Sequence, residues 1–526
     1  MTSLRAWAVV ALLVFSALFW AAGARASVVV DGTRYHYLDD DQMISMRYAR
    51  NLAAGRGLVW NERGERVEGY TNLGWILVMA AVHAAGARDA DAALWVRGIS
   101  WLLGCGVLLL AVRLMVRLDA GHGPPAIAAI LTLSVASDLL FWSTNGFETT
   151  LLTALFLTGL LLALRDAGRG QLGASTCLVA GLLPIVRADA IDLTAAVIVT
   201  AVALGARRRG VWIALAVLPL ALHLLFRVTY YGDWLPNTYY LKVAGRTGLA
   251  VRGLGHAKAF AVGYGCAFAL AGVAFWKTRR PEVRLLSSLV ALGFLRLLVV
   301  GPDMFGGFRF LAPYVPLILV AAACGAHVLA ERARGAGLVA ATVLLVSTTW
   351  AVGVSGRQAF DSLVSGNGMP GTNTVTGVLI NQYTRPDARV VVIAAGCVSY
   401  FGRRESLDLL GKTDRHVARV PAAEGGGTGH NRFDIGWTLK DRPDLVVSLT
   451  TERVVADADA IMRATGMTPA RDNGAALLLN PIFVAEYRPS PVPVDFLLQR
   501  NAIFVHQRSP EWPRRLLWRE PVVGTP

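Results

Sequence analysis

Apolar segments of nearly membrane-spanning length recur throughout the first 354 residues of the chain. Most approach the ~20 residues that an α-helix needs to cross the hydrocarbon layer of a bilayer. Because 54% of the 526 residues are hydrophobic and only 17% are charged, the composition also favours a polytopic membrane protein over a disordered chain. The segments lie near residues 6–26, 73–87, 93–112, 126–143, 147–164, 172–186, 190–205, 211–230, 258–276, 284–300, 309–329 and 335–354.

Short basic clusters between these segments predict how the chain is oriented. Lysine and arginine are enriched in cytoplasmic loops, so we expect the clusters to face the cytoplasm. This bias explains the net charge of +15 better than nucleic-acid binding does. The clusters are Arg113–Arg117, Arg165–Arg169, Arg207–Arg209, Lys277–Arg284 and Arg332–Arg334.

This orientation predicts about eleven transmembrane helices, a cytoplasmic N-terminus and an extracytoplasmic C-terminus. Segment 73–87, at about fifteen residues, is too short for a crossing and is expected to be re-entrant or interfacial. Segments 172–186 and 190–205 are also short, which leaves a margin of about two crossings. Ala24–Ser27 resembles a signal-peptidase site, but the many later spans favour a retained first helix.

The character of the chain changes after residue 354. Glycine and polar residues dominate Ser355–Thr376, and strand-like runs follow at Arg389–Ala395, Leu445–Leu449 and Ala475–Leu479, with helix-like stretches between them. We therefore predict a mainly α polytopic membrane protein with a small C-terminal extracytoplasmic α/β domain. The predicted division is 1–354, which includes a first extracytoplasmic loop at 27–92, and 355–526.

The first outward loop carries three consecutive carboxylates, Asp39 to Asp41, at the start of a helical pattern. Carboxylates that face lipid are costly, so these should lie at an aqueous surface or in a polar cavity. A helix N-terminus also favours anions. A solvated acidic cap explains this loop alone as well as a functional site does.

A second stretch of this loop and four further outward loops also mix acids, bases and aromatic residues, which favours a functional site. We expect them to line one extracytoplasmic cavity. Aromatic rings and carboxylates suit a sugar, and arginine and lysine suit a phosphate, so a sugar on a lipid phosphate fits both. One carboxylate would take the proton of an acceptor hydroxyl while cations stabilise the departing lipid phosphate. The second stretch of the first loop is Glu65–Asn72, and the other loops are Asn145–Thr149, Val186–Ala190, Tyr230–Lys242 and Gly301–Phe310.

Two other classes of protein remain as alternatives. A transporter or flippase of a lipid-linked glycan would also have many spans, but transporters often show internal repeats and broken helices at the membrane midplane. No long repeat is evident in this chain, and the polar residues lie in loops. A non-catalytic envelope scaffold explains the polar loops less well.

The motifs and their order resemble those of polytopic GT-C glycosyltransferases, and among them the terminal arabinofuranosyltransferases of the actinobacterial cell envelope and their bacterial relatives. The resemblance spans about residues 35 to 320 and reaches two motifs of the outer domain. The motifs are Asp40–Leu52, Gly64–Asn72, Gly146–Thr149, Arg187–Asp189, Tyr231–Lys242 and Asp303–Arg309, with Ser399–Arg403 and Leu407–Asp414 in the outer domain.

The resemblance implies a multi-pass enzyme of the bacterial plasma membrane. It implies inverting transfer from a polyprenyl-phosphate sugar to an extracytoplasmic cell-envelope glycan. The general base would lie in the pair Asp40 and Asp41, and we favour Asp40, although Asp39 is an extra acid beside the pair. No cofactor is expected to be required. A divalent ion is compatible with the resemblance, but the sequence offers no dedicated set of metal ligands.

The resemblance also implies substrate-binding residues. The candidate phosphate ligands are Arg47, Arg187, Lys242 and Arg309. The candidate sugar or acceptor ligands are Glu68, Asn72, Glu148 and Asp189, with Tyr240 and Asp303 as further substrate-binding candidates.

Overall fold

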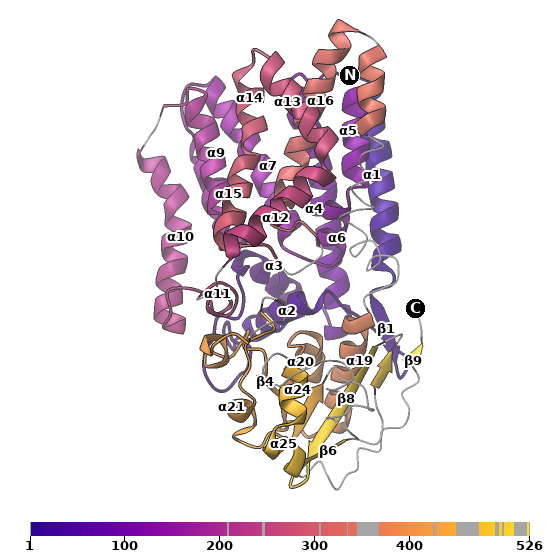
Figure 1. Ribbon diagram of the computed structural model, residues 1–526, viewed down its shortest axis with the longest axis vertical. Helices are drawn as coiled ribbons and strands as arrows, with labels where there is room; N and C mark the ends of the chain where they lie inside the picture. Colours follow the sequence, from indigo (N-terminus) through magenta and orange to yellow (C-terminus); the bar gives the residue numbers. More distant parts are fainter. Residues whose placement is uncertain are drawn as a thin grey trace.

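The computed structural model consists of a tall helical part and a smaller α/β part (Figure 1). The α/β part lies against one end of the helical part, and the first outward loop lies between the two. The structure describes residues 2–207, 210–244, 248–303, 307–333, 335–344, 368–423, 427, 429–448, 473–489, 494–496, 499–509 and 523–524.

The helical part contains seven helical stretches, among the described residues, that are long and apolar enough to cross a membrane. An eighth is present if the bent pair α12–α13 forms one span. The predicted count of eleven is not confirmed, because α8 and α9 are only 13 residues each. The helices are α1 (Thr2–Gly23), α4 (Asp89–Arg117), α5 (Pro124–Ser134), α6 (Ser137–Thr144), α7 (Thr149–Gly168), α8 (Ala174–Val186), α9 (Ile191–Ala203), α10 (Gly210–Tyr231), α11 (Asn237–Lys242), α12 (Leu249–Gly263), α13 (Gly265–Lys277), α14 (Pro281–Ser288), α15 (Val290–Val300), the short η1 (Ala312–Tyr314) and α16 (Val315–Arg332).

Loops that carry the basic clusters meet at the end of the helical part remote from the α/β part. Gln171 pairs with Arg207 in a short β-bridge. Arg280 donates a hydrogen bond to the Leu118 carbonyl (3.1 Å) and lies 2.9 Å from Asp119. The basic and the acidic loops therefore lie at opposite ends, as the predicted orientation requires. Which end faces the cytoplasm stays a prediction.

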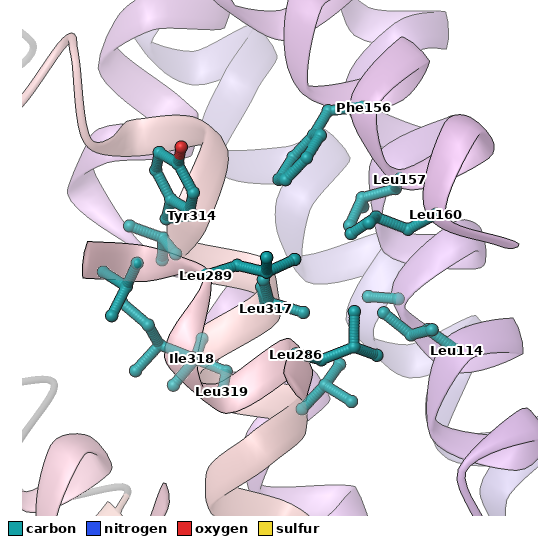
Figure 2. Close-up of a cluster of buried hydrophobic side chains, with 14 of the residues drawn as sticks. Leu114, Phe156, Leu157, Leu160, Leu286, Leu289, Tyr314, Leu317, Ile318 and Leu319 are labelled. Atoms are coloured by element: carbon teal, nitrogen blue, oxygen red, sulfur yellow. The ribbon is translucent and has the colours of Figure 1, made fainter. Parts of the chain in front are cut away.

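Part of the core of the helical part is built from side chains of α7, α14 and α16, with Leu114 of α4 beside them (Figure 2). Phe156 and Leu157 of α7 are fully buried, and Leu286 and Leu317 approach them from α14 and α16. Lipid tails are as apolar as these side chains, so tight van der Waals packing holds such a core. At Gly325 of α16, a β-carbon would collide with the Leu270 carbonyl of α13, so this close helix contact requires glycine.

The α/β part contains a sheet with the strand order β4-β3-β5-β8-β6, and β7 pairs with β8. Strand β3 runs parallel to β4 and β5, whereas β8 is antiparallel to its neighbours. The strands are β3 (Arg389–Val392), β4 (Glu405–Asp408), β5 (Leu445–Ser448), β6 (Tyr487–Pro489), β7 (Val494–Phe496) and β8 (Gln499–His506). The helices are α19 (Gly368–Tyr383), α20 (Cys397–Gly402), η2 (Val417–Arg419), α21 (Ile435–Leu439), α24 (Asn473–Leu478) and α25 (Pro481–Glu486).

Two of the three predicted strands, β3 and β5, are confirmed, and the third is wrong. Residues Asn473–Leu478 form helix α24, in which Leu477 is buried. A short apolar run fits a buried helix turn and a buried strand equally well, so its pattern could not separate the two. The predicted domain boundary at 354/355 lies outside the described residues.

The first outward loop folds into a hairpin and two helices. β1 (Ser27–Val30) and β2 (Thr33–His36) form the hairpin, and β9 (Val523–Gly524) pairs with β1. α2 (Asp40–Ala53) lies between the helical part and α20, and α3 (Leu73–Ala84) packs against α2. At 12 residues, α3 is too short to cross a bilayer, as predicted for this segment.

Candidate active site

A cavity of about 370 Å³ lies where α2, α11 and the loops after α8 and α15 meet. Residues from four outward loops and α2 converge on it, far apart in sequence but close in space. The candidate residues that line it are Asp41, Asn72, Arg187, Asp189, Lys242, Asp303 and Arg309. The structure therefore brings the proposed acids and bases into a single chamber.

Asp41 faces this cavity from the first turn of α2. Asp39 precedes the helix, and its carboxylate accepts a hydrogen bond from the Asp41 backbone N–H (3.0 Å), as an N-cap residue does. The Asp41 carboxylate lies 2.6 Å from the ammonium of Lys412, which also lines the cavity. Asp41 is therefore held at the cavity wall by its helix cap and by an ion pair.

The pKa values of Asp41 and Asp39 are shifted in opposite directions. Burial acts to raise the pKa of Asp41, but the charges of Lys412 and Lys242 outweigh it and lower that pKa below the usual range. Burial, followed by the charge of Asp41, raises the pKa of Asp39 to about 7. Asp41 is therefore ionised at neutral pH, as a proton acceptor must be.

Glu148 holds two arginines together behind the cavity wall. Its Oε1 accepts hydrogen bonds from Arg187 and Arg309, each at 2.7 Å, and the side chain is fully buried. Asn72 donates to Oε2 (3.3 Å) and accepts from Ser45 (3.1 Å). Glu148 therefore holds the two guanidinium groups side by side at the cavity wall.

Two further carboxylates complete this charged wall. Asp189 lies 2.6 Å from Arg187, and Asp303 lies 3.2 Å from Arg309. Arg309 also stacks over the ring of Phe147, with 4.4 Å to the centroid. Both arginines are therefore fixed in place before any ligand binds.

The other side of the cavity is apolar. Val299 and Trp234 beside this rim are 65% and 69% exposed, as expected for side chains that contact lipid. The cavity thus joins a charged wall to an apolar rim. The apolar residues that line it include Leu235, Pro236, Val243, Val299, Val300 and Phe310.

Asp40, our favoured base, is not among the described residues that line the cavity. Its carboxylate accepts hydrogen bonds from the backbone N–H groups of Gly396 (3.0 Å) and Cys397 (2.9 Å) and from the Asn373 amide (3.2 Å). It therefore fastens α2 to the start of α20. We correct our choice of base to Asp41.

Arg47 lies on another side of α2 and lines a separate groove, so its proposed phosphate role is also corrected. Its guanidinium donates to the carbonyls of Trp60 and Ser399, each at 2.6 Å. It also donates to Asn61 (2.8 Å) and Ser406 (3.0 Å). These contacts join the first outward loop to the α/β part and leave the guanidinium occupied.

Three further candidates lie behind the cavity or turn away from it. Glu148 acts from behind, through the arginines. Glu68 is buried and forms an ion pair with Arg227 of α10. The guanidinium of Arg419 stacks over the ring of Tyr240, with its Cζ 3.9 Å from the ring centroid. We therefore withdraw Glu68 and Tyr240 as substrate ligands and regard them as structural contacts.

Lys412 is the site residue that sequence reasoning missed. It lies in Leu407–Asp414, a motif included in the resemblance but given no role there. The spacing of that motif carries no signal that it folds against α2.

Among the described residues, no three His, Cys, Asp or Glu side chains lie close enough together to form a metal site.

The α/β part and the whole chain have recognisable relatives. Residues 367–491 match a family described as a domain of unknown function (DUF8728). The terminal beta-(1->2)-arabinofuranosyltransferase of Corynebacterium glutamicum is 30% identical over 403 residues, 65% of this chain and 54% of that protein. The enzyme of the same name from Mycobacterium tuberculosis is 32% identical over 228 residues, 40% of this chain and 35% of that protein. The chain thus matches about half, or less, of these relatives' length.

Two solved structures share the architecture over most of the chain. ArnT from Cupriavidus metallidurans bound to undecaprenyl phosphate aligns with a TM-score of 0.59 over 95% of this chain and 97% of its own, at 11% identity. AglB from Archaeoglobus fulgidus, in complex with an inhibitory peptide and a dolichol-phosphate, aligns with a TM-score of 0.51 over 90% and 72%, also at 11% identity. Identities this low establish the fold alone. This integral membrane protein therefore shares the fold of ArnT and AglB.

Proposed function

We propose that the protein is an integral-membrane glycosyltransferase that moves a sugar from a polyprenyl-phosphate donor to an extracytoplasmic glycan of the bacterial cell envelope. The observation that carries this proposal is the meeting of Asp41 with Arg187 and Arg309 in one cavity that also has an apolar rim. An ionised base, phosphate-binding cations and a surface for an isoprenoid chain are the three elements that such a transfer requires.

The relatives support both the donor and the sugar. The two curated relatives are named as arabinofuranosyltransferases, which favours arabinofuranose as the transferred sugar. The two structural neighbours were solved with undecaprenyl phosphate and dolichol-phosphate, which favours a lipid phosphate in this cavity. In this proposal the cavity and the α/β part, residues 355–526, face the outside of the plasma membrane.

The donor would lie across the cavity with its phosphate at the charged wall. Arg187 and Arg309 present guanidinium groups that match phosphate geometry, and Glu148 has already ordered them. Lys242 lies nearby, and within the described part of the chain its amine donates no hydrogen bond to protein. The isoprenoid chain would leave past Val299 and Leu235 toward the lipid.

The proposed reaction is a single displacement. Asp41 takes the proton of an acceptor hydroxyl, and that oxygen bonds to the anomeric carbon of the sugar. The bond from that carbon to the phosphate oxygen breaks, and its electron pair stays on the departing polyprenyl phosphate. The arginines stabilise the second negative charge that develops there. Asn72, Asp189 and Asp303 remain as candidate hydroxyl ligands on the cavity wall.

A single displacement inverts the configuration at the anomeric carbon, and this constrains the donor. The relatives' names specify a β linkage. An inverting enzyme forms a β linkage only from an α-linked donor. If this chain forms the same linkage, only the α-phosphoryl anomer will be productive.

The test is a transfer assay with the full chain in lipid nanodiscs. Each anomer of a polyprenyl-phosphate arabinofuranose is supplied with an arabinan oligosaccharide, and the product is analysed by mass spectrometry and NMR. We expect one pentose to be added, with inverted configuration. Transfer with retention would contradict the single displacement. Absence of transfer from any polyprenyl-phosphate pentose or hexose would contradict the proposed function.

A further inference from the structure

Of the described residues that line the cavity, Lys412 alone comes from the α/β part. Lys412 lies in a turn whose backbone conformation is fixed by local hydrogen bonds and by a glycine. The Asp408 carboxylate accepts hydrogen bonds from the backbone N–H groups of Leu410 (3.0 Å) and Thr413 (2.8 Å). Gly411 adopts φ +75°, a conformation that other residues rarely adopt, and a β-carbon there would meet Val417 at 2.7 Å.

Residues of the helical part also contact this turn, from the side opposite the α/β part. The Asn237 side chain, at the start of α11, donates to the carbonyls of Gly411 (2.9 Å) and Lys412 (3.1 Å). A β-carbon on Gly69 would lie 2.6 Å from the Thr413 methyl group, so the two segments are in tight contact. The backbone of Lys412 is thus fixed from both parts, whereas its four-carbon side chain stays adjustable.

The partner of Lys412 is the proposed base itself. Its amine lies 2.6 Å from Asp41, and its side chain is only 8% exposed. Burial opposes the charge of Lys412, yet Asp41 raises the pKa of the amine above its usual range. A carboxylate held by an ammonium in a shielded site is a weakened base, because the ion pair disfavours its protonated form.

The other cations of the wall are bound differently. Arg187 and Arg309 share Glu148 behind the cavity wall and also pair with Asp189 and Asp303, and none of these carboxylates is the proposed base. Their ion pairs can persist throughout a reaction. Lys412 is paired with a group that must itself react, and it has a flexible side chain with which to change partners.

We propose that Lys412 moves from Asp41 to the donor phosphate when the donor binds, and that this exchange both stabilises the leaving phosphate and releases Asp41 to act as the base. The inference rests on the proposed transferase function. A phosphodiester donor carries one negative charge, and the departing monoester carries two. Lys412 supplies a positive charge where the second negative charge develops, and the acceptor proton ends on Asp41.

The exchange gives the α/β part a direct role in the chemistry. Without a donor, Asp41 stays paired and cannot activate water. With a donor, the phosphate replaces the carboxylate as the ligand of the ammonium. Docking of the α/β part therefore completes the phosphate site.

The first test measures binding of a short-chain isoprenyl phosphate to the full chain in nanodiscs. Lys412→Met removes the charge at similar length, Lys412→Arg keeps it, and Lys440→Met is the control at an exposed lysine of the same part. One charged hydrogen bond corresponds to about 10- to 100-fold in affinity, so we expect a loss of that size for Lys412→Met. Lys412→Arg and Lys440→Met should stay within about threefold of the wild type, because both retain the charge at position 412. The uncharged isoprenyl alcohol should bind all four proteins alike.

The second test is the pH profile of kcat/KM for the donor. The fall of kcat/KM at low pH reports the pKa of the base in the free enzyme. Because the charge of Lys412 lowers the pKa of Asp41, removal of Lys412 should move this fall to higher pH. Lys440→Met should leave the fall in place. Lys412→Gln provides the same readouts if Lys412→Met does not fold, as judged by thermal unfolding.

The outcomes separate the two proposals. Unchanged phosphate affinity in folded Lys412→Met, with the wild type binding the phosphate, would overturn the exchange and leave Lys412 only a partner of Asp41. A wild type that neither binds isoprenyl phosphate nor transfers sugar would contradict the proposed function itself.

Discussion

Arg187 lies beside Arg309 because both guanidinium groups donate to the same oxygen of Glu148, each at 2.7 Å. The two arginines come from different outward loops. Like charges repel, and the fully buried carboxylate that lies between them offsets that repulsion. This relationship explains how a phosphate site can exist before the donor arrives.

Glu148→Gln should disrupt that site. The amide keeps the size of the side chain but removes the charge that Arg187 and Arg309 share, which leaves each arginine with one ion-pair partner, Asp189 or Asp303. We expect a loss of about 3–5 kcal/mol in the free energy of unfolding, as for other broken buried ion pairs, and weaker donor binding. Thermal unfolding and donor KM are the measurements. Glu331→Gln, at an exposed carboxylate 65% accessible to solvent, is the control, and an equal effect from it would contradict this role for Glu148.

Gly396→Ala should loosen the contact between α2 and the α/β part. A β-carbon on Gly396 would collide with the Asp40 carbonyl, and the backbone on either side is held by hydrogen bonds to Asp40. We expect destabilisation of about 1–3 kcal/mol and faster hydrogen exchange in α20. Gly402→Ala is the matched control in the same helix, because its nearest neighbour would be 3.6 Å away. If both variants behave alike, the close contact does not matter.

Asp39→Asn should make the protein more stable at high pH. The native pKa of Asp39 is raised to about 7, mainly by burial, so its ionisation opposes folding. Its contribution to stability is full below the unfolded-state pKa, near 4, and is lost as pH rises through about 7. Asparagine is an equally good N-cap, so α2 keeps its start. Thermal unfolding should show an advantage for Asp39→Asn at pH 8 that vanishes near pH 4. An advantage independent of pH would contradict this explanation.

Much of the site could be predicted because charged residues on outward loops are excluded from the lipid and must lie in an aqueous region. Carboxylates and arginines that avoid lipid must meet at an aqueous chamber, and the order of the loops placed Arg187, Asp189 and Arg309 at one end of the helices. The sequence could not show which side of α2 faces the chamber. Asp40 and Arg47 are seven residues apart and share the side toward α20, whereas Asp41 and Ser45 share the side toward the cavity.

Other features depend on tertiary contacts that leave no local signal. Lys412 meets Asp41 across 371 positions of sequence. The sequence predicted Glu68 as a sugar ligand, but its buried carboxylate forms an ion pair with Arg227 of α10. A charged side chain has the same appearance in sequence whether it binds a substrate or fixes the fold.

The most direct test of the account is the rate of sugar transfer by Asp41→Asn in lipid nanodiscs, beside the wild type and Asp39→Asn. The amide cannot accept the hydroxyl proton, so we predict a protein that still folds, as judged by a cooperative thermal unfolding transition, and a kcat lower by about 10²–10⁴-fold. Asp39→Asn should keep most of its activity at pH 7. Near-normal kcat in folded Asp41→Asn would show that another group accepts the proton and would contradict the central claim.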